Sequence, residues 1–164
     1  MRVRPGGEGD AGGIARVHRE SRAGTMPYLP PQSRSHEQVV RWVEEVVLAG
    51  CEVWVAVMPG EGEEEEVVGY AAGADGWLEH LYLLPHVRRR GIGTRLLERA
   101  RRSCPAGLSL HVFEANTEAR AFYERHGFTV VATDDGSGNM ERLPSLTMRW
   151  APAPAPAPAP STAS

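Results

Sequence analysis

Residues 81–97 read LYLLPHVRRRGIGTRLL, and they are the most informative part of the chain. An apolar run ends at Pro85, three arginines lead to Gly91 and Gly93, and a helical apolar pattern follows. The first turn of a helix has backbone N–H groups without partners and the positive end of the helix dipole. Glycines let an anion approach that backbone closely. The stretch therefore indicates a phosphate or pyrophosphate site, although it is equally typical of a plain strand-to-helix connection.

Two common phosphate-binding turns do not match this stretch. A P-loop requires a lysine, and every one of the 18 basic residues in the chain is arginine. A dinucleotide-binding turn has the pattern G-x-G-x-x-G, but position 96 is leucine. The spacing that remains is R-x-x-G-x-G, which begins at Arg88.

The apolar periodicity predicts a single α/β domain over residues 1–150, with a mixed central sheet and helices on both faces. A helix capped by Asp10 precedes the sheet's middle strands, and so does a helix that begins with the Ser35–Gln38 capping box. The second helix is expected to carry an apolar stripe at Val39, Trp42, Val43, Val46 and Val47. Two further helices are expected at 92–102 and 117–126. Hairpins make most of the sheet antiparallel, and the strand-helix-strand unit at 77–113 requires a parallel pair. Strands are expected at 1–4, 53–57, 67–72, 77–85, 108–113, 129–132 and 146–150.

Composition excludes several classes of protein. The net charge is −3, so the chain as a whole is not a polycation for nucleic acid. No apolar window is long enough for a membrane span, and the N-terminus has no signal-peptide core, so a cytoplasmic protein without a membrane partner is expected. Cys51 and Cys104 lack metal-type spacing, and no metal is expected. Residues 151–164 begin with APAPAPAPAP and predict a disordered tail.

Two motifs together resemble the GCN5-related N-acetyltransferase (GNAT) family. Residues 81–97 resemble its acetyl-CoA-binding motif, and 116-NTEARAFYERHGF-128 resembles its second cofactor motif, N-x-x-A-x-x-F-Y-x-x-x-G-F. The resemblance covers residues 1–150 and implies that the parallel strand pair splays apart to form a slot. It also implies acetyl-CoA as the acetyl donor. An amine-bearing small molecule or peptide is the implied acceptor, and a homodimer is one option.

The resemblance assigns cofactor roles to residues of both motifs. Main-chain groups of Leu81 and Leu83 are expected to pair with the pantetheine arm as an added strand would. Asn116 is implied as a pantetheine contact, and a helix N-cap is an equal reading. Tyr123 is implied as the general acid that protonates the leaving thiolate, and it also lies beside the cofactor. The pyrophosphate is expected on the backbone amides of Arg88, Arg89, Arg90, Gly91, Ile92, Gly93 and Thr94.

The acceptor half of the site is less defined. Glu79 is the preferred general base, because strand alternation puts it on the face of Leu81 and Leu83; His80 and His111 are alternatives. The implied acceptor walls are 26-MPYLPP-31, with Tyr28, and 136-GSGNMERLPSLTM-148, with Asn139 and Glu141. Some relatives carry N-E-E-x-x-P-D in the second segment. Two carboxylates of that pattern are absent here, which favours a less cationic acceptor.

Three functions are compatible with these patterns. The leading one is an acetyl-CoA-dependent N-acetyltransferase that transfers the acetyl group to a primary amine by direct attack in a ternary complex. The second is a non-catalytic acyl-CoA-binding regulator that kept the slot. The third is a nucleic-acid module that uses the arginines of 88–102, and the acidic net charge argues against it.

Overall fold

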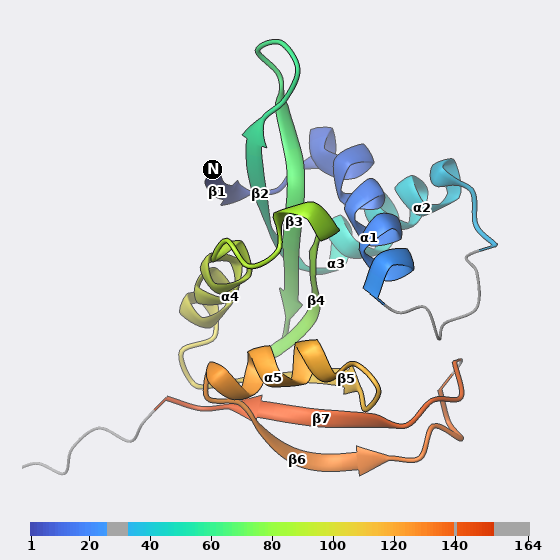
Figure 1. Ribbon diagram of the computed structural model, residues 1–164, viewed down its shortest axis with the longest axis vertical. Helices are drawn as coiled ribbons and strands as arrows, with labels where there is room; N and C mark the ends of the chain where they lie inside the picture. The colour runs from blue at the N-terminus through green and yellow to red at the C-terminus, as the bar shows by residue number, and fades with distance from the viewer. Residues whose placement is uncertain (26–32, 140, 153–164) are drawn as a thin grey trace, which may run out of the picture.

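The computed structural model describes residues 1–25, 33–139 and 141–152 (Figure 1). One seven-stranded sheet runs through them in the order β1-β2-β3-β4-β5-β7-β6. Only β4 and β5 are parallel, and every other neighbouring pair is antiparallel, so the predicted mixed sheet is confirmed. The strands are β1 (Arg2–Pro5), β2 (Glu52–Pro59), β3 (Glu65–Ala74), β4 (Trp77–Leu83), β5 (Leu108–Phe113), β6 (Thr129–Asp134) and β7 (Ser145–Trp150).

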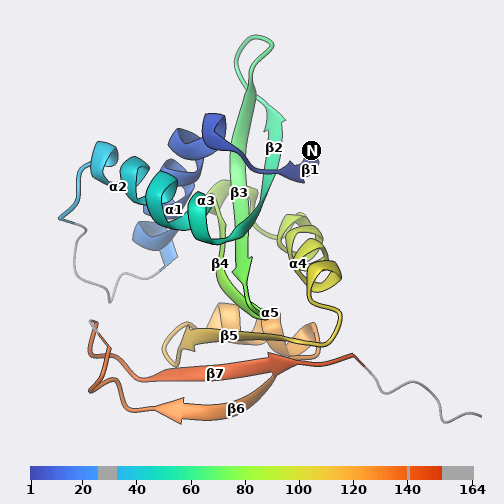
Figure 2. The same ribbon diagram turned by 180° about the vertical axis from the view of Figure 1, so that it is seen from behind.

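Helices cover both faces of the sheet's first half. The first helices lie on one side of β3 and α4 lies on the other, while α5 lies beside β5 (Figures 1 and 2). Strands buried on both faces read as continuous apolar runs, and Val53–Val57 is such a run. The helices are α1 (Ala11–Thr25), α2 (His36–Trp42), α3 (Leu48–Gly50), α4 (Ile92–Ser103) and α5 (Thr117–Arg125).

Two local expectations are wrong. Asp10 does not cap α1: its carboxylate pairs with Arg4 at 2.9 Å and accepts the Gly7 N–H at 2.9 Å, which closes a 3₁₀ turn before the helix. Val46 was expected on an apolar helix face, but it is 53% exposed. The chain forms a π-helical turn at Val43–Val47, and this wider turn keeps Val43 and Val47 inward while it rotates Val46 toward solvent.

The β4–β5 pair opens soon after it begins. Trp77 pairs with Ser109 and Leu78 pairs with Leu110, and beyond these residues no β4–β5 pairing continues within the described part of the chain. Strand β5 instead pairs with β7 over its whole length, from Leu108 to Phe113. The sheet therefore divides into an upper half of β1–β4 and a lower half of β5–β7, as Figures 1 and 2 show. The predicted tail falls almost entirely outside the described residues.

Candidate active site

A cavity of about 1150 Å³ lies where β4 and β5 diverge. Both sequence motifs reach it, and so does the connection between β6 and β7. Ligand sites in proteins are concave and few, which makes this cavity the candidate active site. Its lining includes, among the residues singled out in the sequence, Glu79, Leu81, Leu83, Arg88, Arg89, Gly91, Gly93, Thr94, His111, Asn116, Tyr123, Asn139 and Glu141.

The start of α4 presents backbone donors at one end of this cleft. Gly91 precedes the helix with φ of 79°, a left-handed conformation that glycine adopts without strain, and no side chain caps the helix. The first helical bond is donated by Arg95 to the Gly91 carbonyl. Across the described residues, the N–H groups of Ile92, Gly93 and Thr94 have no backbone acceptor. Such a helix start suits an anion, and the pyrophosphate site expected there stays a prediction.

The free edge of β4 forms the next part of the cleft. The Leu84 N–H donates to the Val68 carbonyl on β3 at 2.8 Å. Because backbone groups of successive strand residues point to opposite edges, Tyr82 faces β3 and the main chain of Leu81 and Leu83 faces the opening. An extended ligand arm could therefore pair with these two residues, which agrees with the role expected for them.

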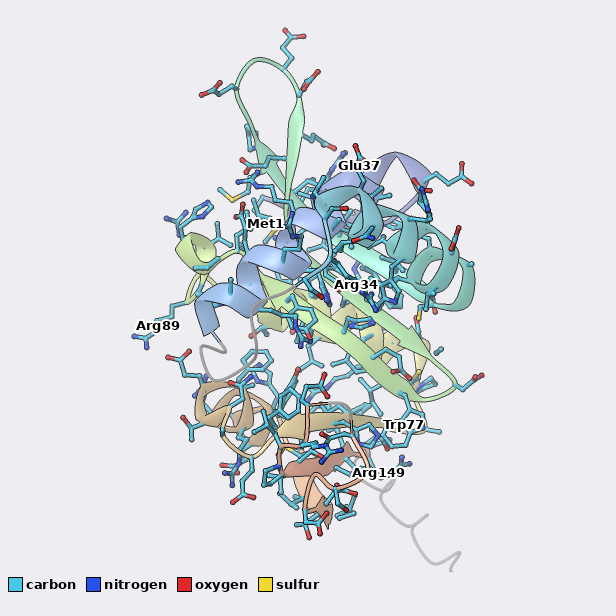
Figure 3. The ribbon with its side chains drawn as sticks, turned by 90° about the vertical axis from the view of Figure 1, so that its right-hand side faces the viewer. Met1, Arg34, Glu37, Trp77, Arg89 and Arg149 are labelled. Atoms are coloured by element: carbon cyan, nitrogen blue, oxygen red, sulfur yellow. The ribbon has the colours of Figure 1, made fainter. Side chains whose placement is uncertain are left out.

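The arginines before the glycine turn differ in their surroundings. The Arg88 guanidinium lies close to the hydroxyl of Ser21 on α1, at 3.3 Å, so its side chain ties the turn to the first helix. Arg89 extends into solvent (Figure 3) and lies 3.9 Å from Glu118. Arg90 is exposed as well. Arg89 and Arg90 are expected to contribute their backbone amides, not their side chains, to the pyrophosphate site. Arg89 has a positive φ of 64° in this turn.

The second motif places α5 along the same cleft. The Asn116 side chain accepts the Ala119 N–H at 3.2 Å, so the N-cap reading of this residue is confirmed, and Asn116 also lines the cleft. Tyr123 is buried, and this burial, together with the nearby Tyr82, raises its pKa above the ordinary value. The Thr94 hydroxyl lies 3.0 Å from His126 Nε2, while His126 Nδ1 lies 2.7 Å from the Phe122 carbonyl. This bridge, which the sequence did not predict, joins the first turn of α4 to the end of α5.

A β-bulge lies at Glu79. Gly73 pairs with Leu78 and Ala72 pairs with His80, so Glu79 is the extra residue of β4. A bulge interrupts the alternation of side chains, and the face of Glu79 cannot be taken from Leu81 and Leu83 as the sequence argument did. Glu79 is exposed and still lines the cleft.

Behind β4 lies a cluster of two histidines and three other aromatic side chains. His18 Nδ1 lies 2.8 Å from the Tyr70 hydroxyl, and the ring centroids of His18 and His80 are 5.8 Å apart. His80 Nδ1 is buried without a hydrogen-bond partner among the described residues. Burial is the main cause that lowers the pKa of His18 to about 3 and that of His80 to about 4. Both rings are therefore neutral at pH 7. The cluster is completed by Trp42, Tyr70 and Tyr82.

His111, the other alternative base, lies on the opposite wall of the cleft. Its ring stacks on Trp77 with 4.7 Å between centroids, and its Nδ1 lies 3.1 Å from the Thr147 hydroxyl. The stacking on Trp77 and the contact of Nδ1 with Thr147 together fix the orientation of the His111 ring against the sheet. Its side chain is exposed on β5.

The connection between β6 and β7 closes the other end of the cleft. The Asn139 side chain bonds to Leu143 twice, donating to its carbonyl at 2.8 Å and accepting its N–H at 3.2 Å. Glu141 lies 3.9 Å from Arg22, which belongs to the last turn of α1. Asn139 thus shapes the segment, while the Glu141 side chain reaches across the cleft. Tyr28 lies outside the described residues.

Comparison with known proteins identifies the family. Residues 49–130 match the family model described as acetyltransferase (GNAT) domain. The chain belongs to the GNAT family of acetyltransferases. This assignment confirms the predicted family and fold class.

Curated relatives agree with this membership. The chain is 35% identical to the peptidyl-lysine N-acetyltransferase YjaB of Salmonella typhimurium over 57% of this chain and 63% of the relative's length. It is 33% identical to the probable N-acetyltransferase Rv2775 of Mycobacterium tuberculosis over 70% and 69% of the two chains. The match thus spans less than two thirds of the length of YjaB.

The solved structures agree on the fold. A putative acetyltransferase, yncA of Salmonella typhimurium, was solved with its cofactor acetyl-CoA. It superposes with a TM-score of 0.70 at 23% identity, over 98% of each chain. GNAT proteins typically use acetyl-CoA as donor, and the open start of α4 fits a pyrophosphate. Within the described residues, no group of three or more side chains is suited to hold a metal ion, and no helix has the length and apolarity to span a membrane.

Proposed function

We propose that this protein transfers the acetyl group of acetyl-CoA to a primary amine by direct attack in a ternary complex. One observation carries the proposal: the uncapped start of α4, the free edge of β4 and the phenol of Tyr123 line one cleft. These are an anion site, a strand-like site for an extended arm and a proton donor, in the order that an acyl-CoA requires.

The pyrophosphate is proposed on the amides of the turn and first helical residues from Arg88 to Thr94. The pantetheine arm is proposed along Leu81 and Leu83, with Asn116 at its side. The Asn116 Oδ1 already accepts the Ala119 N–H, so the amide nitrogen is the group left for the cofactor.

The chemical step needs an acid and a base. The amine nitrogen attacks the thioester carbonyl carbon, the C–S bond breaks, and the sulfur leaves as a thiolate that takes the Tyr123 proton. Because burial raises the pKa of Tyr123, its phenol is fully protonated at neutral pH. The amine must first lose a proton, since a lysine-type amine has a pKa of about 10.4.

Glu79 is the proposed base, acting directly or through water, because it is exposed to the cleft between the two motifs. His80, the residue after Glu79, is the alternative, since its ring is neutral and its buried Nδ1 has no hydrogen-bond partner among the described residues. Glu79→Gln and His80→Gln separate the two. The substitution that removes the true base lowers kcat/KM at pH 7. Its kcat/KM recovers in part at high pH, because more of the amine acceptor is already neutral there. The other variant keeps the wild-type pH profile.

Peptidyl-lysine is the first acceptor class to test, because relatives such as YjaB are named for it. Free amino acids and small monoamines form the comparison set. A homodimer is retained from the family resemblance as a proposal, and sedimentation of the full chain measures it.

The first experiment is a thermal-shift titration with acetyl-CoA and CoA, with ATP as control. A ligand at about 100 times its Kd adds roughly 2.7 kcal/mol to the native state. We expect acetyl-CoA and CoA to raise the melting temperature and ATP to have no effect. An acceptor panel with detection of released CoA thiol follows. Stabilisation without thiol release from any amine would favour the non-catalytic acyl-CoA-binding regulator, and no stabilisation at all would overturn the cofactor site.

A further inference from the structure

Glu141 lines the cleft, and Arg22 faces it from the end of α1. Arg22 belongs to the last turn of α1, and Glu141 belongs to the connection between β6 and β7. These two elements come from the upper and lower halves of the molecule and approach each other on one side of it (Figures 1 and 2). Their side chains are only 21% and 31% exposed. The pair is therefore not a freely solvated surface contact.

Within the described part of the chain, the geometry of this pair leaves the hydrogen-bonding capacity of Arg22 largely unused. The distance between Arg22 and Glu141 is 3.9 Å, which is beyond hydrogen-bond length. A guanidinium can hold a carboxylate with two parallel N–H···O bonds, and Glu141 makes neither of them. Glu141 thus offsets the charge of Arg22 without accepting hydrogen bonds from its two parallel N–H donors.

Arg22 does not itself line the cleft, but it lies beside two residues that do. Its charge acts on His18, His80 and Tyr70, which places the guanidinium beside the cluster behind β4. The neighbouring Ser21 and the facing Glu141 both line the cleft. Strand β4 carries both His80 and Glu79, the proposed base, so the charge of Arg22 acts on the strand that holds this base.

We propose that Arg22 binds a carboxylate of the acceptor next to its reactive amine, and that Glu141 competes with that carboxylate. The acceptor class is therefore an amine with a neighbouring carboxylate, such as a lysine flanked by Asp or Glu, or a free amino acid. This inference rests on the proposed acetyl transfer. It also agrees with the two carboxylates that this chain lacks relative to N-E-E-x-x-P-D, since their loss lowers the attraction for cationic acceptors.

The test compares matched acceptors at a fixed acetyl-CoA concentration. Three peptides carry one lysine flanked by Asp, Gln or Arg, and alanine with alaninamide forms a second pair. A charge-assisted bidentate contact favours the acidic member by about tenfold or more in kcat/KM. A preference within the peptides identifies a side-chain carboxylate, and a preference for alanine identifies an α-carboxylate.

Substitutions at Arg22 and at Glu141 are expected to change the preference for acidic acceptors in opposite directions. Arg22→Gln is expected to reduce the acidic preference to about one, and Arg22→Lys is expected to keep only part of it, because the charge stays while the fork is lost. Glu141→Gln is expected to increase the preference, because the competing carboxylate is gone. Arg41→Gln and Glu45→Gln make the same charge changes at exposed positions of the second helical region, and both are expected to match the wild type.

The outcomes are distinguishable from those of the proposed function. Thiol release with the Gln-flanked peptide, but no acidic preference in either pair, would overturn this inference and leave the acetyl transfer standing. An acidic preference that survives Arg22→Gln in a folded protein would also overturn it. Failure of every acceptor to release CoA thiol would overturn the acetyl transfer itself, and the inference with it.

Discussion

The two ends of the cleft are built in different ways. The proposed cofactor end consists mainly of main-chain groups from neighbouring stretches: the Gly91 turn, the first amides of α4 and the free edge of β4. The proposed acceptor end consists of side chains from α1, β4 and the connection between β6 and β7. A main-chain site tolerates many side-chain changes as long as the backbone conformation is kept. A side-chain site changes its ligand with a single substitution, so we expect specificity to lie at the acceptor end.

The largest expected effect is at Tyr123, between the two ends. Tyr123→Phe removes the proposed acid and should lower kcat by roughly 10²–10³ while acetyl-CoA affinity stays unchanged. Steady-state kinetics with calorimetric measurement of acetyl-CoA binding check this. Phe122→Leu, next to it on α5, is a packing control that keeps the phenol. An unchanged kcat for Tyr123→Phe would remove this residue from the chemistry.

The second effect is a pH dependence of the free energy of unfolding, caused by the histidines His18 and His80. His18 and His80 have folded pKa values of about 3 and about 4, below the ordinary value of about 6.5. Unfolding lets these rings take up protons, so the free energy of unfolding falls as the pH drops below about 6.5 toward the folded values. At pH 5 the loss is about 2 kcal/mol for one such histidine, relative to pH 7.

His80→Phe should remove part of this pH dependence, because phenylalanine cannot be protonated and fits an aromatic cluster. Urea unfolding at pH 7 and pH 5 measures it, and His86→Phe, at an exposed position, is the matched control. An equal loss of stability between pH 7 and pH 5 in wild type and His80→Phe would contradict the assigned role of burial.

A smaller effect on acetyl-CoA affinity is expected at the cofactor end, where two glycines of the same backbone conformation can be compared. Gly91 and Gly62 have φ of 79° and 78°, and a Cβ at either position meets no atom within 4 Å. Gly91→Ala and Gly62→Ala should therefore cost similar stability, about 1 kcal/mol. Only Gly91→Ala should weaken acetyl-CoA binding, by roughly tenfold, because only its Cβ stands where the ligand approaches the backbone. Equal affinities in the two variants would exclude the turn as the pyrophosphate site.

The smallest effect is expected at Arg89. Its side chain is 89% exposed and 3.9 Å from Glu118, so the pair is screened by solvent. Arg89→Gln should change acetyl-CoA affinity by less than about twofold at 0.15 M salt. A tenfold loss at this salt concentration would mean that the cofactor end depends on side chains as much as the acceptor end does.

The sequence by itself determined the order of the elements, the mixed sheet and the glycine turn at the start of α4, and it offered the cap at Asn116 as one of two interpretations. Each of these depends on residues that are close in the chain, so periodicity and spacing carry the signal. Only the tertiary structure decided the bulge at Glu79, because a bulge depends on the register between β3 and β4. It also decided the contact of His18 with Tyr70 and that of Arg22 with Glu141. These partners lie far apart in the sequence. Packing of α1 against β3 and β4 brings His18 to Tyr70, and the same packing places the end of α1 opposite the connection between β6 and β7.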